Sequence, residues 1–210
     1  MNRTAPARVG AARATSHPTG RVLVGLAVLL TVVIGTVGHQ SLTATAGTIG
    51  ELLGSDDHGP LGEADGLLPD GASLFDHTPA VSNLDPALLA ALRRAARDAA
   101  AAGVGFEVNS GWRSSAYQEW LLEEAVEEHG SAEEAARWVA TARTSAHVAG
   151  DAVDLGPSDA VAWLSRHGAG YGLCQIYRNE RWHYELRPAA PERGCPPMYA
   201  DPTQDPRTTQ

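Results

Sequence analysis

The sequence predicts an α+β fold with a small antiparallel sheet flanked by helices. Segments with apolar residues at helical spacing come first, from about residue 85 to residue 140. Segments that alternate like strands come mostly later, and two of them, at 171–177 and 181–186, are close enough to form a hairpin. Helices followed by strands in this order are typical of α+β folds.

The first long helix is expected directly after Asp85, which can cap it. Pro86 suits its first position and Gly103 can end it. A strand is then expected at 104–110, where VGFEVNS alternates in polarity. The other expected elements are helices at 116–130 (capped by Ser114 or Ser115), 132–140 (with Ser131 and Glu134 as a capping box) and 159–168 (opened by Ser158), and strands at 151–156, 171–177 and 181–186.

The N-terminal part of the chain indicates export. Residues 22–38 are uncharged and follow a basic segment, 1–21, that holds four arginines and no acid. This asymmetry predicts that the N-terminus stays in the cytoplasm and the body lies outside it. We expect an uncleaved signal-anchor that attaches the protein to the membrane; a secreted protein cleaved after Ala46 is the alternative.

The remainder of the chain divides by composition. A flexible linker is expected at 39–72, a folded domain at 73–188 and an irregular, proline-rich tail at 189–210. The two cysteines, Cys174 and Cys195, are expected to pair outside the cytoplasm. Such a disulfide closes a loop of about 20 residues and contributes roughly 3 kcal/mol.

The charge of the exported part argues against nucleic acid as a partner. After residue 46 the chain has 12 arginines against 25 acidic residues, a formal charge of −13. Such a body repels a phosphate backbone. We expect no nucleic-acid partner and a monomeric protein.

Three residues could hold a catalytic metal ion. Zinc in such sites takes three protein ligands, among them histidine and carboxylate, and keeps a fourth position open. His147, Asp154 and His183 supply such a set. The stretch that holds the first two is too broken by glycine to be helical, and Gly150 lets the chain bend so that both face one point.

A metal-assisted hydrolysis also needs a general base and a fixed positive charge. Glu180 and Glu185 are both candidates for the base, and spacing alone does not choose between them, although alternation places Glu185 on the same strand face as His183. Arg113, at the end of a strand, could stabilise an oxyanion. Each residue also has an ordinary explanation as a loop or surface residue.

Three motifs together resemble the VanY-type D-alanyl-D-alanine carboxypeptidases of the M15 (M15B) zinc metallopeptidases, which have the hedgehog/DD-peptidase fold. The resemblance covers about residues 75–188. The motifs are S-G-[YW]-R-S-x-x-x-Q from Ser110 to Gln118, S-x-H-x-x-G-x-A-x-D from Ser145 to Asp154, and E-x-W-H from Glu180 to His183.

The resemblance implies a role for each matching position. It implies one Zn²⁺ held by His147, Asp154 and His183. Glu180 matches the catalytic base, which leaves Glu185 a supporting or structural role, and Arg113 matches the carbonyl-polarising arginine. Ser145 and Gln118 match positions that line the substrate pocket. Arg181 departs from the proline that many relatives have there.

The implied activity is removal of the terminal D-alanine from peptidoglycan stem peptides. An L,D-carboxypeptidase or a stem-peptide endopeptidase could use the same zinc site, because these motifs do not report how the pocket is closed. A non-catalytic cell-wall binding module is an alternative from another class. The presence of all the ligands, the base and the arginine argues against it.

Overall fold

The computed structural model describes residues 60–208 of the chain. The expected basic segment 1–21, the hydrophobic segment 22–38 and most of the expected linker 39–72 lie outside the described residues. Within the described range, no helix is both long enough and apolar enough to cross a membrane.

A four-stranded antiparallel sheet forms the centre of the described part. The strands are β1 (Glu107–Ser110), β2 (Ala152–Gly156), β3 (Leu173–Gln175) and β4 (His183–Leu186), in the order β1-β2-β4-β3. This confirms the α+β class and the late hairpin, since β3 and β4 are neighbours. The loop between them runs over 176–182 and is longer than the expected turn at 178–180.

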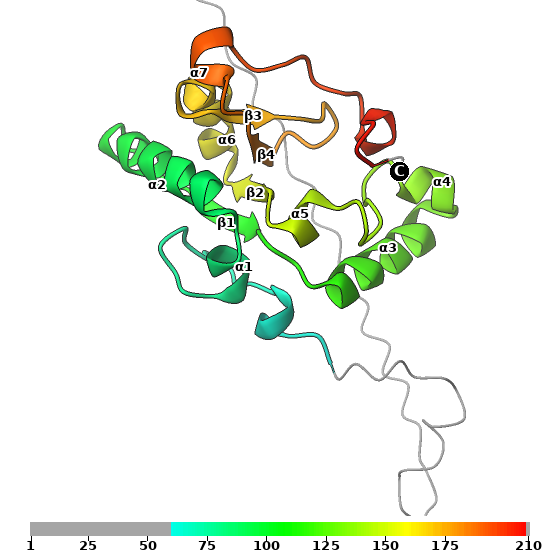
Figure 1. Cartoon of the computed structure of the whole chain (residues 1–210). Coiled ribbons are helices and arrows are strands. Elements are labelled where there is room, and N and C mark those ends of the chain that lie inside the picture. Colours follow the sequence, from blue (N-terminus) through cyan, green and yellow to red (C-terminus); the bar gives the residue numbers. More distant parts are fainter. Residues whose placement is uncertain (1–59, 209–210) are drawn as a thin grey trace, which may run out of the picture. The chain divides into compact units, whose positions relative to one another are not determined.

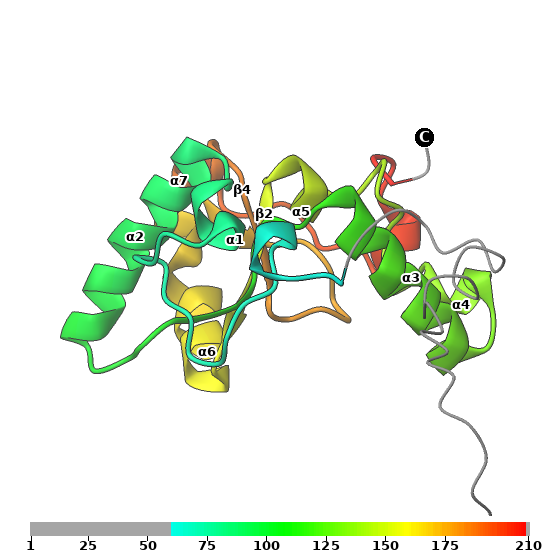
Figure 2. The same cartoon turned by 90° about the horizontal axis from the view of Figure 1, so that it is seen from below.

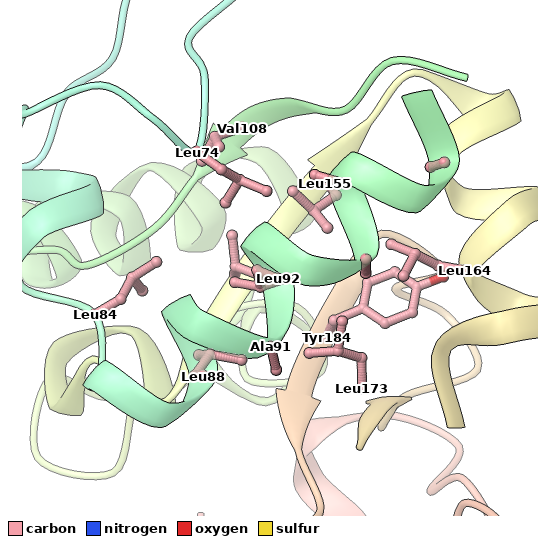
Figure 3. Close-up of a cluster of buried hydrophobic side chains, with 14 of the residues drawn as sticks. Leu74, Leu84, Leu88, Ala91, Leu92, Val108, Leu155, Leu164, Leu173 and Tyr184 are labelled. Carbon is pink, nitrogen blue, oxygen red and sulfur yellow. The ribbon is translucent and has the colours of Figure 1, made fainter. Parts of the chain in front are cut away.

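Helices α2 (Pro86–Ala101) and α6 (Ser158–His167) cover the sheet and build the core (Figure 1). The Asp85 side chain accepts the N–H groups of the first turn of α2, as its capping position predicts. Leu88 and Leu92 of α2 are fully buried, and Tyr184 of β4 meets the same cluster, which Figure 3 shows. Burial of each leucine contributes roughly 1.5–3 kcal/mol.

Two further helices pack against each other. Helix α3 (Ser115–His129) is capped by Ser114, and α4 (Ala132–Ala135) is capped by Ser131. Figure 2 shows α3 and α4 together on the side away from α2 and α6. The other short helices are η2 (Glu63–Asp65), α1 (Pro79–Ser82), α5 (Ala146–Ala149), η3 (Gly168–Tyr171), α7 (Ala190–Arg193) and η4 (Pro202–Gln204).

Two of these elements differ from the expectation. Helix α4 ends at Ala135 and is followed by turns, where a helix was expected to continue to 140. The segment judged too glycine-broken for a helix contains one helical turn, α5. That expectation was wrong because four residues suffice when Ser145 caps the start and Gly150 ends it in the left-handed conformation.

The folded part extends beyond both expected limits, 73 and 188. Residues 60–72, expected to be linker, include η2, and the Ser114 backbone N–H donates to the carbonyl of Asp65. Ala72 is buried and its carbonyl accepts a hydrogen bond from Val108. The tail carries α7 and η4, and the expected disulfide Cys174–Cys195 joins it to β3.

Candidate metal centre

The sheet register places two of the predicted ligands opposite each other. Asp154 of β2 pairs with His183 of β4, and Ser110 of β1 lies on the other side of Asp154. Alternation along β4 sends His183 and Glu185 to the polar face, while Tyr184 enters the core, as expected. The sheet therefore brings together ligands that are far apart in sequence.

Helix α5 supplies the third predicted ligand. His147 lies within the single turn, and Gly150 returns the chain towards β2 with a φ of +79°. A Cβ at Gly150 would lie 2.5 Å from the carbonyl oxygen of Asn83, so the bend needs glycine both for its conformation and for space. The expected bend at Gly150 is present.

Three ligand atoms of these side chains face one another. His147 Nε2 lies 3.2 Å from His183 Nδ1 and 3.4 Å from Asp154 Oδ1, and His183 Nδ1 lies 3.3 Å from the same oxygen. Ligand atoms about 2.0–2.2 Å from a tetrahedral zinc ion are about 3.3–3.6 Å apart. The donor set and its spacing fit zinc.

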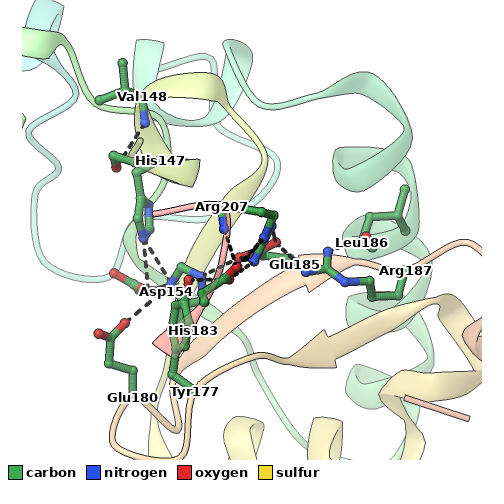
Figure 4. Close-up of polar contacts among 12 residues, drawn as sticks. His147, Val148, Asp154, Tyr177, Glu180, His183, Glu185, Leu186, Arg187 and Arg207 are labelled. Atoms are coloured by element: carbon green, nitrogen blue, oxygen red, sulfur yellow. Dashed lines mark hydrogen bonds and ion pairs between the residues drawn. The ribbon is translucent and has the colours of Figure 1, made fainter. Parts of the chain in front are cut away.

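Hydrogen bonds behind each ring turn the correct nitrogen towards the centre. The Nδ1–H of His147 donates to the Gly111 carbonyl at 2.8 Å, so its Nε2 carries the lone pair. The Nε2–H of His183 donates to Glu185 Oε1 at 3.2 Å, which turns its Nδ1 inwards. Burial acts to lower the pKa of His183, but hydrogen bonds to Asp154 and Glu185 outweigh burial and raise this pKa to about 9, so a metal ion would take the place of the Nδ1 proton. Figure 4 shows both rings aimed at Asp154.

The charge and the unpaired oxygen of Asp154 favour a bound cation at this centre. Asp154 Oδ1 is buried without a hydrogen-bond partner among the described residues. Burial acts to raise the pKa of Asp154, but His147, His183 and Arg113 outweigh burial and hold this pKa well below its ordinary value. Burial and the charge of Arg113 lower the pKa of His147, which keeps this ring neutral as a ligand must be.

Glu180 lies at the edge of the ligand triangle. Its Oε2 is 3.7 Å from His183 Nδ1, and its Oε1 is buried without a hydrogen-bond partner within residues 60–208. Burial raises the pKa of Glu180 to about 7. A carboxyl group with a pKa near neutrality can both take up and release a proton in one catalytic cycle.

The geometry separates the two candidate bases. Glu185 is 1% exposed and accepts hydrogen bonds from His183, Arg187 and Arg207. Burial acts to raise its pKa, but these partners outweigh burial and lower it, so Glu185 stays ionised and poorly suited to proton transfer. The loop residue Glu180 lines the pocket instead.

Arg113 is held in a fixed orientation beside Asp154. Its Nη2 donates to Asp154 Oδ2 at 3.0 Å, its Nη1 to Gln118 Oε1 at 3.1 Å and its Nε to Ser110 Oγ at 2.8 Å. These bonds use three of its five N–H groups. The guanidinium also lines the pocket, so a substrate oxygen can reach it.

The two predicted pocket residues have further roles. Gln118 is 1% exposed; its Nε2 donates to the carbonyl of Ala140 while its Oε1 accepts from Arg113, so it supports the arginine. Ser145 is buried and its Oγ accepts from the Val148 N–H as the cap of α5. Both side chains line the pocket, and direct contact with substrate remains a prediction.

One pocket of about 200 Å³ opens onto the predicted metal ligands. Sequence reasoning missed several of its walls: Tyr177 and Trp138 on loops, and Pro202 and Thr208 from the tail. Trp138 and Trp182 are both about two-fifths exposed at this pocket, an unusual exposure for large aromatic residues. Trp182 belongs to the E-x-W-H motif, but no local pattern in the sequence points to Tyr177, Trp138, Pro202 or Thr208, because they reach the pocket only through the fold.

Comparison with protein families gives one match. The family model described as VanY, D-alanyl-D-alanine carboxypeptidase, matches residues 81–188. All three motif segments, 110–118, 145–154 and 180–183, lie within the matched residues. No curated protein matches the sequence.

Several solved structures are similar to this chain. VanYB in complex with D-alanine-D-alanine is 26% identical and aligns over 49% of this chain and 71% of that chain, with a TM-score of 0.47. The LdcB LD-carboxypeptidase is 21% identical over 64% of this chain and 72% of that chain, with a TM-score of 0.49. DacB from Streptococcus pneumoniae D39 is 26% identical over 61% of this chain and 76% of that chain, with a TM-score of 0.44.

Proposed function

This chain belongs to the VanY family of D-alanyl-D-alanine carboxypeptidases, and from that premise we propose that it is a zinc-dependent enzyme that removes the terminal D-alanine from peptidoglycan stem peptides. The observation that carries the proposal is the buried triangle of His147, Asp154 and His183, with Glu180 beside it and Arg113 across it.

His147, Asp154 and His183 would hold the zinc ion through the atoms that face one another. When bound, zinc supplies Lewis acidity beside the scissile carbonyl. Gly111 and Glu185 keep the two rings in the tautomers that this role needs.

Glu180 moves the proton. Its side chain lines the pocket and its Oε1 has no hydrogen-bond partner among residues 60–208, so the carboxylate can accept the proton of the attacking water. Water adds to the carbonyl carbon, and the peptide C–N bond then breaks. Glu180 returns the proton to the departing nitrogen, so that D-alanine leaves as a neutral amine and Glu180 is again ionised.

Arg113 stabilises the negative charge that develops on the carbonyl oxygen. Its orientation is fixed by Ser110, Gln118 and Asp154 before substrate arrives, so little reorganisation is needed during the reaction. A guanidinium held in this way donates N–H groups where the oxyanion forms.

The experiment that tests the proposal follows one substrate. The purified, zinc-loaded protein is incubated with a muramyl pentapeptide that ends in D-Ala-D-Ala, and products are identified by mass spectrometry. We expect loss of one alanine, abolished by a chelator and restored by zinc. Cleavage of a tetrapeptide alone would indicate an L,D-carboxypeptidase, and cleavage within a cross-linked stem an endopeptidase. If the protein binds these peptides but cleaves none of them, the result would favour a non-catalytic cell-wall binding module.

We further propose that the enzyme acts outside the cytoplasm, anchored by residues 22–38. The uncharged run after four arginines supports this, and so does the disulfide Cys174–Cys195, a bond favoured in oxidising compartments. Protease added to intact cells should digest the body of the protein. Protection equal to that of a cytoplasmic marker would contradict the location.

A further inference from the structure

The C-terminal segment, residues 199–208, lies beyond the family match at 81–188 but contacts the site. It pairs with the loop that leads to Glu180. The Tyr199 N–H donates to the carbonyl of Ile176 at 2.9 Å, and the N–H of Arg178 donates to the carbonyl of Tyr199 at 3.0 Å. Pro202 and Thr208 then line the pocket itself.

Arg207 brings this segment to the carboxylate behind a metal ligand. Its Nη1 donates to Glu185 Oε2 at 2.7 Å and its Nη2 to Glu185 Oε1 at 3.1 Å, a bidentate pair. Glu185 Oε1 is also the acceptor for the Nε2–H of His183. One side chain therefore separates Arg207 from His183, as Figure 4 shows.

Arg207 is itself held by a buried partner. Its Nε donates to both carboxylate oxygens of Asp205 at 3.0 Å, and Asp205 is fully buried. The hydroxyl of Tyr177, a pocket residue, donates to the same carboxylate at 3.0 Å. A continuous path of hydrogen bonds thus runs from Tyr177 through Asp205, Arg207 and Glu185 to His183.

The geometry has a direct consequence for metal binding. A bidentate guanidinium fixes the plane of a carboxylate as well as its charge. The plane of Glu185 in turn sets where Oε1 lies, and so the angle of the His183 ring. Groups that orient a ligand histidine typically change metal affinity when they are removed.

We propose that Arg207 is a positioning residue that, through Glu185, holds the ring of His183 for the metal ion. The inference rests on the proposed zinc site. It assigns to the C-terminal segment a part in the active site, beyond the residues that carry the family motifs. Arg187 also contacts Glu185 Oε2, at 2.8 Å, but Arg207 contacts both oxygens.

The test measures zinc affinity, which does not depend on turnover. Full-length wild type, Arg207→Met and Arg207→Lys are titrated with zinc against a chelating dye at fixed pH. The matched control is Arg193→Met, an exposed arginine of α7 on the same tail. We expect Arg207→Met to bind zinc roughly tenfold more weakly, Arg207→Lys to recover only part of the loss, and the control to match wild type.

A second variant guards against loss of folding. Asp205→Asn keeps the shape of the segment but weakens its hold on Arg207, and circular dichroism reports whether each variant is folded. In folded variants we expect kcat to fall in parallel with zinc affinity at subsaturating zinc, while KM for the peptide stays close to wild type.

The outcomes are distinct. Wild-type zinc affinity in folded Arg207→Met would overturn the positioning role and leave the proposed function intact. Wild-type zinc affinity in Arg207→Lys would show that the positive charge alone is sufficient, and would overturn the role of the bidentate contact. A wild-type protein that binds no zinc would overturn both the inference and the proposed function.

Discussion

At the residue scale, the site separates the groups that we propose to bind zinc from the group that we propose to move the proton. His147, Asp154 and His183 present their ligand atoms to one point, and Glu180 lies 3.7 Å from the nearest of those atoms. Arg113 has a third role, because it donates to Asp154 and lines the pocket but has no lone pair with which to coordinate a metal ion. Substitutions should therefore have separable effects.

We predict that His147→Ala and Asp154→Ala lose zinc, whereas Glu180→Gln retains it. The glutamine keeps the size of the side chain but cannot accept the proton of water. Its kcat should fall by about 10²–10⁴-fold. Metal analysis of the purified variants, alongside peptide assays, measures both effects. Loss of zinc from Glu180→Gln would contradict the separation of roles.

A substitution at Arg113 tests the oxyanion role. Arg113→Lys keeps a positive charge but cannot reproduce the three bonds to Ser110, Gln118 and Asp154. We expect kcat to fall by about 10²–10³-fold with zinc still bound. Steady-state kinetics with metal analysis gives the result, and Arg97→Lys on the exposed face of α2 is the control. An unchanged kcat would exclude this role.

At the scale of elements, sequence patterns predicted the long elements better than the short ones. Helix α2 has a capping residue, a proline and an apolar face, and the structure places it as expected. Helix α5 has four residues and no periodicity, so the sequence predicted the bend at Gly150 but not the helical turn. Spacing alone did not choose between Glu180 and Glu185, and only the family resemblance favoured Glu180. The physical difference between them depends on the loop 176–182, which contacts the distant C-terminal segment.

The turn between α5 and β2 can be tested by a pair of glycine variants. Gly150 and Gly130 have nearly the same φ, +79° and +80°, but only at Gly150 would a Cβ meet a backbone oxygen, at 2.5 Å. Gly130→Ala should cost roughly 1–2 kcal/mol in the free energy of unfolding. Gly150→Ala should cost more and also weaken zinc binding, because His147 and Asp154 flank the turn.

Urea denaturation and zinc titration of the two variants provide the measurements. Equal destabilisation of Gly150→Ala and Gly130→Ala would mean that the backbone shifts away from the new Cβ at residue 150 without a cost in free energy, so that the close approach to Asn83 does not matter. Unchanged zinc affinity in Gly150→Ala would show that the turn does not set the spacing of the two ligands.

At the scale of the whole molecule, the tail is the part that composition described least well. Its prolines predicted irregular structure, and no strand forms in the described part of it. Asp201 and Asp205 are nevertheless buried there, although aspartate is seldom buried without a partner. Asp201 pairs with Arg137, 64 residues away, which no local pattern could reveal. Asp205 pairs with Arg207 in the same short turn, but its burial depends on packing against the distant Tyr177.

The attachment of the tail should depend on pH in a definite direction. Burial acts to raise the pKa of Asp205, but hydrogen bonds from Arg207 outweigh burial and lower it below its ordinary value of 3.8. The ionised carboxylate therefore stabilises the folded state fully above that value, and this stabilisation is lost as pH falls through the lower, folded-state pKa. We predict that the Tm difference between wild type and Asp205→Asn is constant from pH 5.5 to pH 7, because Asp205 is ionised in both the folded and the unfolded state over that range. The difference should shrink below about pH 4. Thermal melts across this range, with Asp70→Asn as an exposed control, measure it; a difference that persists unchanged at about pH 3 would show that the Asp205 charge does not hold the segment.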